Sequence, residues 1–379
     1  MKQSWNLALI AFFAEVSLTT LSIYIPYRAY NLGANNETVG IIGGASSIVY
    51  VVMPFIMGRL SDRVGQKRML IAGTLTVSIL SAGYFLITNP VLFIPLRVVE
   101  GFGWSMVWPP LESLVSTSSE DPYRGLARFN IAWGVGAAFA PIFGGVIVLA
   151  TSIRFTLAMS SLVALLGALF IGLTPAPHRA HIESQTIKFS QSSRRRIPLL
   201  PLYFSAMYGV TAQIVTTFYP RYATTLNFSV LEWGTVVSLF LLGRLVAFIF
   251  SENVRKRIGL QNMFWSFSAI AVIFPISAIF VGTFFALDSL TSFLTGACIG
   301  YIYSATISKM VVGPVEYRGR AAGMFESSIG LGTFLGPAVA GYVAVGGLSL
   351  TLALPALMMI LAAMIGIAGR RKLGPEFPL

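Results

Sequence analysis

Hydrophobic residues in this chain form long runs that are separated by short polar breaks. Cutting the sequence at its polar and charged positions leaves twelve apolar segments of roughly 20 residues or more, each long enough to cross ~30 Å of hydrocarbon as a helix. The pattern therefore predicts twelve membrane-spanning helices. Their expected ranges are 5–29, 38–57, 69–87, 91–116, 126–150, 154–174, 197–223, 232–251, 263–282, 287–311, 321–344 and 348–369.

A polar stretch near the middle of the chain separates six of these segments from the other six. We expect an N-terminal six-helix bundle over residues 1–174, a cytoplasmic linker over 175–196 and a C-terminal six-helix bundle over 197–379. An internal repeat supports an all-α membrane fold of two pseudo-symmetric bundles, because a shift of 196 residues aligns the fifth segment with the eleventh. The shift pairs Arg124 with Arg320, Phe129 with Phe325, Gly134 with Gly330, Gly136 with Gly332, Pro141 with Pro337 and Gly145 with Gly341.

Composition and charge agree with a membrane protein. Hydrophobic residues make up 55% of the chain and charged residues only 11%, and the mean hydropathy is +0.77. Most Lys and Arg residues fall in alternate loops, so the positive-inside rule predicts a multi-pass protein of the cell membrane with both termini in the cytoplasm. The net charge of +12 then reflects topology, and a nucleic-acid partner is not expected. The first segment is expected to remain as a helix, because it extends beyond the core of a signal peptide.

The loop between the second and third segments is short and basic, and its motif residues are Gly58, Asp62, Arg63, Gly65, Lys67 and Arg68. It resembles the loop that joins helices 2 and 3 in transporters of the major facilitator superfamily, whose pattern reads Gly-x-Leu-[Ala/Ser]-Asp-Arg-x-Gly. The resemblance implies a solute carrier that works by alternating access. It also implies that Asp62 contacts the positive N-terminal end of helix 11 in the outward-facing state. A solvated loop that only sets the orientation is the simpler alternative.

The fourth segment contains residues 97–103, which are similar to the family pattern Arg-x-x-[Gln/x]-Gly-x-Gly. On a helical wheel, Arg97, Glu100, Trp104 and Trp108 lie within about 80° of one another. One face of the helix therefore collects a cation, a carboxylate and two indoles. Either a structural ion pair or a role in proton or substrate binding explains Arg97 and Glu100.

Glycine and proline recur in the fifth segment at Gly136, Pro141 and Gly145. These positions are similar to the antiporter signature of the family, Gly-x-x-x-Gly-Pro-x-x-Gly-Gly, with alanine in place of one glycine. The resemblance implies antiport and a helix at the moving interface between the halves. The eleventh segment carries a similar pattern at Gly336 and Pro337, so tight helix packing by itself also explains both motifs.

Several charged side chains lie inside the apolar segments. Each costs up to ~3 kcal/mol when it faces lipid, so we expect these side chains to face protein or water. The facing of the fourth segment's last carboxylate depends on whether Pro109 and Pro110 kink the helix before it. Glu15 or Glu100 is expected to carry a proton, with Arg97 adjusting its affinity. The candidates for proton coupling are Glu15, Arg97, Glu100, Glu112 and Glu326.

Aromatic and polar side chains near these charges are candidates for the wall of a substrate cavity. Aromatic rings offer stacking surfaces to an amphipathic substrate, although rings on a helix face serve equally well in packing. The candidates for the cavity wall are Trp104, Trp108, Tyr208, Thr211, Arg244 and Tyr301.

The sequence thus predicts a monomeric secondary active transporter in the lipid bilayer, and the hypothesis is proton-coupled antiport that exports a small amphipathic compound. One alternative keeps the fold but uses Arg97 and Arg244 to bind an organic anion, as a symporter or exchanger. A second alternative is a membrane sensor that binds a ligand without moving it. An enzyme is not expected and no cofactor or metal is predicted, because both histidines, His178 and His181, lie in the linker, and the sequence has no nucleotide-binding glycine loop.

Overall fold

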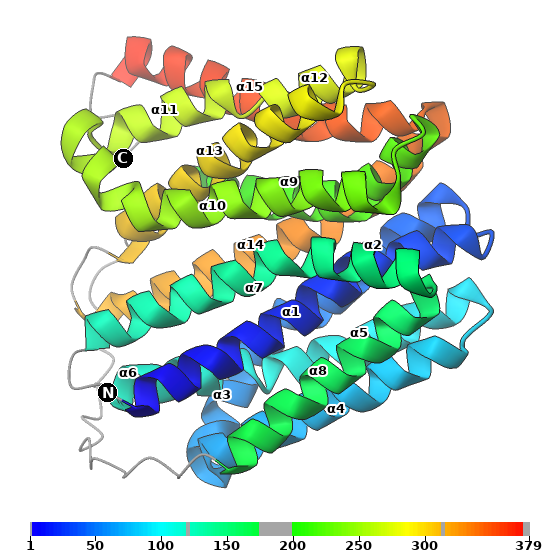
Figure 1. Ribbon diagram of the computed structural model, residues 1–379. Helices are drawn as coiled ribbons and strands as arrows, with labels where there is room; N and C mark the ends of the chain where they lie inside the picture. The colour runs from blue at the N-terminus through cyan, green and yellow to red at the C-terminus, as the bar shows by residue number, and fades with distance from the viewer. Residues whose placement is uncertain (1, 119–121, 174–198, 312–314, 374–379) are drawn as a thin grey trace.

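The computed structural model describes residues 2–118, 122–173, 199–311 and 315–373, and every regular element within these ranges is a helix (Figure 1). Among the described residues, ten helices or helix pairs are long and apolar enough to cross a membrane. The bent pair Asn36–Tyr50 and Met53–Val64 adds an eleventh span. The final helix begins with a shorter apolar stretch, Leu348–Leu361, and occupies the twelfth position. The predicted fold class of two six-helix bundles is therefore confirmed.

The helices fall into two sets, which occupy the lower and upper parts of Figure 1. The first set is α1 (Lys2–Asn31), α2 (Asn36–Tyr50), α3 (Met53–Val64), α4 (Gln66–Leu86), α5 (Phe93–Ser105), α6 (Trp108–Ser118), α7 (Pro122–Ala150) and α8 (Ile153–Leu173). The second set is α9 (Leu199–Thr225), α10 (Val230–Ile258), α11 (Leu260–Ile270), α12 (Ile273–Val281), α13 (Phe285–Val311), α14 (Val315–Val343) and α15 (Leu348–Leu373). Short 3-10 turns, Pro90–Leu92 and Ala344–Gly346, precede α5 and α15.

Three of the twelve spans are broken into two helices, and each break has a proline just after it. The α2–α3 pair bends by 44°, and Pro54 stands in the first turn of α3. Pro109 and Pro110 follow the first residue of α6, and Pro275 lies in the first turn of α12. Proline has no N–H and clashes with the preceding turn, so it fits the start of a helix better than its interior. The fourth span is therefore broken between Ser105 and Trp108, just before the two prolines that precede Glu112.

The two bundles are related by equivalent packing of α7 and α14. Helix α7 packs on α1 and α10, and α14 packs on α9 and α2. An alanine at Gly136 would clash with the Phe12 carbonyl of α1, and an alanine at Gly332 would clash with the Ala206 carbonyl of α9. Positions paired by the sequence repeat thus make equivalent contacts. The domain boundaries at 174 and 197 stay a prediction, because the linker over 175–196 lies outside the described residues.

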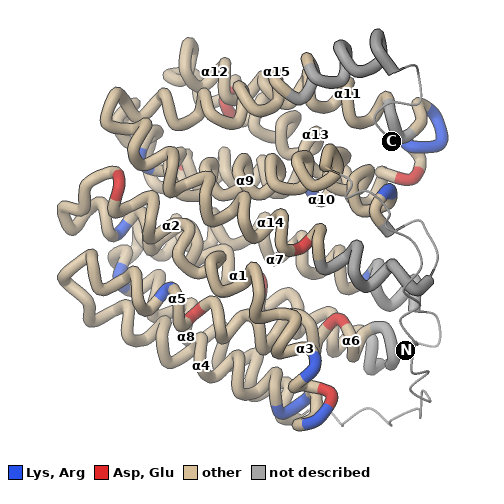
Figure 2. The backbone as a smooth tube through the Cα atoms, turned by 180° about the vertical axis from the view of Figure 1, so that it is seen from behind, with Lys and Arg blue, Asp and Glu red and all other residues tan. Residues whose placement is uncertain are grey.

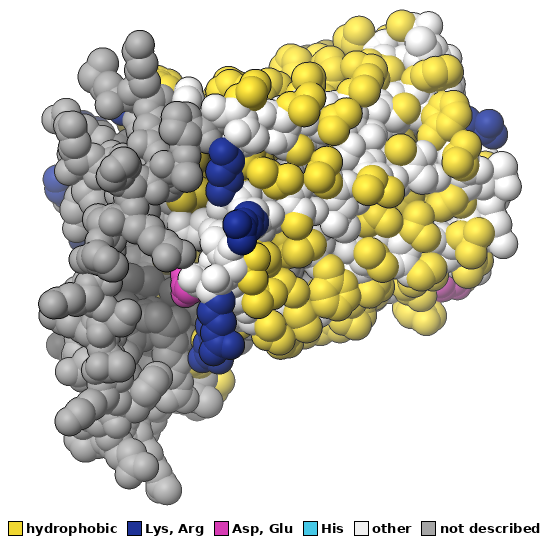
Figure 3. Space-filling view, turned by 90° about the horizontal axis from the view of Figure 1, so that it is seen from below, with side chains coloured by type: hydrophobic (Ala, Val, Ile, Leu, Met, Phe, Trp, Pro, Cys, Tyr) yellow, Lys and Arg dark blue, Asp and Glu magenta, His cyan; other side chains and the backbone are white. Residues whose placement is uncertain are grey.

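The outer surface of the bundle is apolar along its length. Large side chains such as Ile79, Leu169 and Phe280 are more than half exposed. Figure 3 shows hydrophobic side chains over the flank of the molecule and Lys and Arg side chains near its end, and Figure 2 shows few charges along the middle of the helices. A surface of this kind is stable against hydrocarbon rather than water, so the protein is a multi-span membrane protein.

Candidate functional site

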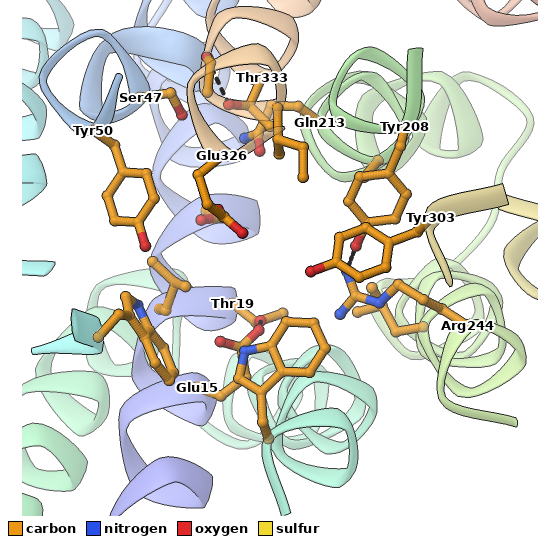
Figure 4. A pocket seen from close by; sticks show the side chains of 18 of the residues that line it. Glu15, Thr19, Ser47, Tyr50, Tyr208, Gln213, Arg244, Tyr303, Glu326 and Thr333 are labelled. Carbon is orange, nitrogen blue, oxygen red and sulfur yellow. Dashed lines mark hydrogen bonds between the residues drawn. The ribbon is translucent and has the colours of Figure 1, made fainter. Parts of the chain in front are cut away.

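A cavity of about 730 Å³ lies between the two halves of the molecule. Its wall is built by α1, α2, α5, α6 and α7 from the first half and by α9, α10, α13 and α14 from the second half. This volume is in the range of sites that enclose a small organic molecule. Figure 4 shows side chains from both halves turned toward the same space, among them Glu15, Tyr50, Tyr208, Arg244, Tyr303 and Glu326.

The two halves close against each other at the end of the bundle where α2 and α10 begin, here called the far end. Gly40 of α2 lies so close to the Pro337 carbonyl of α14 that an alanine side chain would clash with it. Arg221 of α9 donates a hydrogen bond to the Tyr30 hydroxyl of α1, and its guanidinium carbon lies 3.6 Å from the centre of the Tyr30 ring. Contacts across the seam therefore seal the cavity at the far end.

The cavity extends from this seal toward the opposite end of the bundle, where α8 ends and α9 begins, here called the linker end. Thr216 and Thr333 line it on the far side, whereas Ser251 and Ser308 line it near the linker-end termini of α10 and α13. The cavity lining thus continues from the middle of the helices toward the linker end and not toward the far end.

Three carboxyl groups and one guanidinium group line the cavity, from Glu15, Glu112, Glu326 and Arg244. These are the charged side chains among the described residues of the wall, and they carry a net charge of −2 when all are ionised. A cavity of low dielectric with an excess of one sign attracts ligands of the opposite sign. Within the described ranges, no three His, Cys, Asp or Glu side chains are grouped so that they could hold a metal ion.

Glu15 and Arg244 belong to opposite halves and are both buried. Thr19, one turn further along α1, donates its hydroxyl to Glu15 Oε1 at 2.8 Å. Arg244 donates from Nη1 to the Tyr208 hydroxyl at 3.1 Å, and its guanidinium carbon lies 4.6 Å from the centre of the Trp133 ring. Arg244 is therefore held by its own half and by the other half, within electrostatic range of Glu15.

Arg97 and Glu100 lie inside the first bundle and not in the cavity wall as described. Arg97 Nη1 lies 2.7 Å from Glu100 Oε1, and Arg97 Nε donates to the Ile42 carbonyl at 3.3 Å. Glu100 also accepts hydrogen bonds from Trp104 Nε1 at 3.0 Å and from the Tyr84 hydroxyl at 2.7 Å. Arg97 and Glu100 thus form a buried ion pair whose hydrogen bonds are satisfied. This favours a structural role for the two residues over a role in proton or substrate binding.

Most of the side chains expected in the cavity do line it, but two do not. Thr211 is fully buried and donates its hydroxyl to the Met207 carbonyl of its own helix at 2.9 Å. The Tyr301 ring stacks on Phe267 with 4.4 Å between the ring centres, away from the described wall. Thr211 and Tyr301 thus lie outside the described wall, and a role for either in substrate binding stays a prediction. Those that do line it are Glu15, Trp104, Trp108, Glu112, Tyr208, Arg244 and Glu326, and their roles in transport stay proposals.

Several lining residues were missed by the sequence reasoning. Tyr303 and Gln213 each stand two positions after a predicted residue, which turns them by about 200° to another face of the helix. Trp133 has a polar indole N–H within an otherwise apolar segment. This was the one sequence feature that could have marked it as a lining residue. Among the missed residues are Tyr50, Phe129, Trp133, Gln213, Phe248 and Tyr303.

The motif loop between α3 and α4 is a tight connection at the linker end. Gly65 has a φ of 104°, which favours glycine, and it joins the two helices directly. Lys67 donates to the Gly172 carbonyl of α8 at 2.8 Å. The side chains of Asp62, Arg63 and Arg68 are exposed. The predicted contact of Asp62 with helix 11 is not tested, because the side chains in the first turns of α14 lie outside the described residues.

The remaining motif residues lie where helices approach closely. Gly145 packs near the Val230 carbonyl of α10, and Gly336 packs against Val210 of α9. Pro141 offers its carbonyl to the Tyr24 hydroxyl of α1 at 2.6 Å. Gly58 lies beside Pro109, at a distance that would place an alanine side chain in ordinary contact, 3.8 Å away.

Comparison with known proteins identifies the family of this chain. The family description Major Facilitator Superfamily matches residues 7–312. An uncharacterized MFS-type transporter of Methanocaldococcus jannaschii is 22% identical over 338 residues, which cover 83% of this chain and 84% of that protein. In overall structure the chain resembles a mutant form of the nucleoside transporter NupG, with a TM-score of 0.83, 15% identity and coverage of 97% of this chain and 99% of the other.

Two further relatives match part of the chain. The methyl viologen resistance protein SmvA of Salmonella typhimurium is 32% identical over 141 residues, which cover 35% of this chain and 27% of that protein. The multidrug efflux pump SdrM of Staphylococcus aureus is 29% identical over 141 residues, which cover 37% of this chain and 31% of that protein. Because the family match extends over most of the twelve-helix chain and agrees with its fold and central cavity, this protein belongs to the major facilitator superfamily of membrane transporters.

Proposed function

We propose that this transporter exports amphipathic organic cations in exchange for protons. The observation that carries the proposal is the cavity between the halves, where three carboxyl groups outnumber the single guanidinium group of the described wall. Indole and phenol rings form much of the remaining wall, including Trp104, Trp108, Tyr208 and Tyr303. Carboxylates attract a positive charge, and aromatic faces bind both a cation and the flat apolar part of the same molecule.

Glu15 is the residue that we assign to the proton. Its carboxyl group comes from the first half, and the nearest basic side chain of the wall, Arg244, comes from the second half. A rocking movement of the halves changes the distance between them. A carboxyl group favours its charged form beside a guanidinium group and its protonated form when the guanidinium group withdraws and water is expelled. Glu100 does not suit this role, because three donors inside one rigid bundle hold its charge.

The orientation predicted by the basic loops makes the linker end cytoplasmic. The cavity then faces the cytoplasm while the far end is closed, which is the arrangement that loads a substrate for export. The names of SmvA and SdrM, a resistance protein and an efflux pump, agree with export, and their similarity reaches about a third of this chain.

Proteoliposomes with a preset proton gradient and an internal pH dye test this proposal. Lipophilic cations are expected to trigger proton movement in the wild type, and Glu15→Gln is expected to abolish it while cation binding persists. Glu252→Gln is the matched control, since Glu252 is an exposed carboxylate of α10 that pairs with Arg255 outside the cavity wall. Full proton-driven transport by Glu15→Gln would contradict the assignment.

An organic-anion carrier is the second candidate, and the position of Arg244 in the wall favours it. Arg97 is engaged with Glu100, so this alternative depends on Arg244 by itself. Proton or tracer movement that only anions trigger, and that Arg244→Ala removes, would support it. A membrane sensor would instead bind a ligand with no flux of any ion or tracer.

A further inference from the structure

Two of the cavity carboxyl groups form a pair across the seam between the halves. Glu112 comes from α6 of the first half and Glu326 from α14 of the second half. Both side chains are exposed and line the same cavity, one from each side of the seam. No described residue donates a hydrogen bond to either of them. The phenol ring of Tyr50 lines the same cavity as both groups.

This pair differs from Glu15 in its surroundings. Glu15 has the guanidinium group of Arg244 nearby to offset its charge, whereas the described wall contains no second basic side chain to offset Glu112 and Glu326. Two carboxylates that share one cavity repel each other, and water screens them less there than in bulk solvent. A ligand with two positive charges compensates both groups, and a ligand with one positive charge compensates only one.

Flat aromatic surfaces lie next to the pair. Trp108 stands one helical turn before Glu112 and lines the cavity, and its ring stacks on Trp104 with 6.2 Å between the ring centres. Tyr50 faces Glu326 across the space shown in Figure 4. A planar cationic ring system can therefore stack against these rings while its charged atoms approach the carboxylates.

We propose that Glu112 and Glu326 form a binding site for planar organic dications, with one carboxylate supplied by each half, separate from the proton site at Glu15. This inference rests on the proposed function and narrows its substrate class. The pair makes the carrier prefer a dication over a monocation of the same shape, because the second carboxylate adds attraction only when a second charge is present.

A matched pair of probes tests the site. N-methyl-4-phenylpyridinium and methyl viologen each consist of two linked six-membered aromatic rings, and they carry one and two positive charges. Equilibrium binding of both probes is measured on the purified full-length protein. Glu112→Gln and Glu326→Gln are each expected to weaken methyl viologen binding about tenfold, which corresponds to roughly 1.4 kcal/mol, and to change binding of the monocation less than about threefold. Glu252→Gln is expected to change neither.

Retained binding of the monocation shows that each variant is folded, so a selective loss of dication binding supports the site. Equal losses for both probes, or no loss for either, would overturn it. The same samples in proteoliposomes separate this inference from the proposed function. Proton-coupled export of the monocation without any preference for the dication would overturn only the dication site. Failure of the wild type to move protons with either cation would overturn the proposed function as well.

Discussion

Two buried glutamates, Glu100 and Glu15, have different neighbours, and we therefore propose different roles for them. Glu100 is fully buried and is bonded by Arg97, Trp104 and Tyr84 within one bundle. Glu15 is 3% exposed, lines the cavity and faces a guanidinium group of the other half. A charge with fixed partners stabilises the fold, and a charge whose partner moves responds to conformation.

The first prediction concerns the fixed charge. Glu100→Gln leaves the Arg97 guanidinium group buried without a carboxylate, so we expect a loss of about 3–5 kcal/mol in stability. Tyr84→Phe removes one hydrogen bond from the same group and is expected to cost about 1 kcal/mol. Thermal unfolding of the purified variants in detergent measures both. Equal melting temperatures for Glu100→Gln and the wild type would contradict the structural role of the pair.

The second prediction concerns the movable charge. Glu15→Gln is expected to lower the free energy of unfolding by less than about 1 kcal/mol, because Gln still accepts the hydrogen bond of Thr19. Proton movement is nevertheless expected to stop. Melting temperature and proton flux, measured on the same preparation, separate the two effects. A large fall in melting temperature would show that Glu15 is a structural residue like Glu100.

The last carbonyl groups of α4 accept hydrogen bonds from a side chain of another helix. The guanidinium group of Arg28, near the end of α1, donates to the carbonyls of Tyr84, Phe85 and Ile87 at the end of α4. The side chain is 1% exposed, although its position in the sequence places it near a loop. Unsatisfied carbonyl groups are costly in or near a bilayer, so this arginine acts as a cap from a neighbouring helix.

The third prediction tests the cap. Arg28→Ala removes several charge-assisted hydrogen bonds, and we expect it to cost about 3 kcal/mol in stability. Arg28→Lys keeps the charge but not the planar fork of donors, so it is expected to recover only part of the loss. Thermal unfolding in detergent compares the three proteins. A melting temperature of Arg28→Ala equal to that of the wild type would show that the carbonyls find other partners.

At the scale of the whole molecule, the seams between the halves are built from glycine contacts similar to those inside each half. Gly40 of α2 meets the Pro337 carbonyl of α14 across the seam, and Gly296 of α13 meets the Phe240 carbonyl of α10 within the second half. An added methyl group clashes with a backbone carbonyl at both sites. In the proposed rocking movement the first contact breaks when the far end opens, whereas the second lies within one bundle and is kept.

The fourth prediction separates these two kinds of contact. Gly296→Ala is expected to lower stability by about 1–3 kcal/mol through overpacking. Gly40→Ala is expected to change the melting temperature little and to shift the carrier toward a state with an open far end. A single cysteine reports that opening. Thr217→Cys lies beside Gly43 at the far end, and Cys298→Ala removes the only native cysteine.

Labelling with a membrane-impermeant maleimide completes this experiment. In the wild-type background, Thr217→Cys is expected to react slowly, and Ser308→Cys in the cavity wall is expected to react from the side of the linker end. Adding Gly40→Ala is expected to speed the labelling of Thr217→Cys about tenfold, equivalent to a shift of roughly 1.4 kcal/mol. Fast labelling of Thr217→Cys without Gly40→Ala would contradict a closed far end.

The lengths of the apolar runs were enough to predict the spans and most of their ends, and of the three breaks the sequence pointed only to the one at Pro109 and Pro110. The ranges expected for the fifth and sixth spans, 126–150 and 154–174, agree closely with α7 (Pro122–Ala150) and α8 (Ile153–Leu173). The length of an apolar run sets a span, and proline sets a break, so both are local properties of the chain. The charged residues inside the spans were also visible, because charge stands out in an apolar segment.

The face that each helix turns toward the cavity became known from the packed structure and not from the sequence. A membrane helix is apolar toward lipid and apolar toward its neighbours, so its hydrophobic pattern does not show which side faces inward. Sequence reasoning therefore chose Thr211 and Tyr301, where the cavity is lined by Gln213 and Tyr303. For the same reason the sequence left the role of Glu100 open. Its hydrogen-bond donors Tyr84, from another helix, and Trp104, one turn further along, are apparent only in the structure.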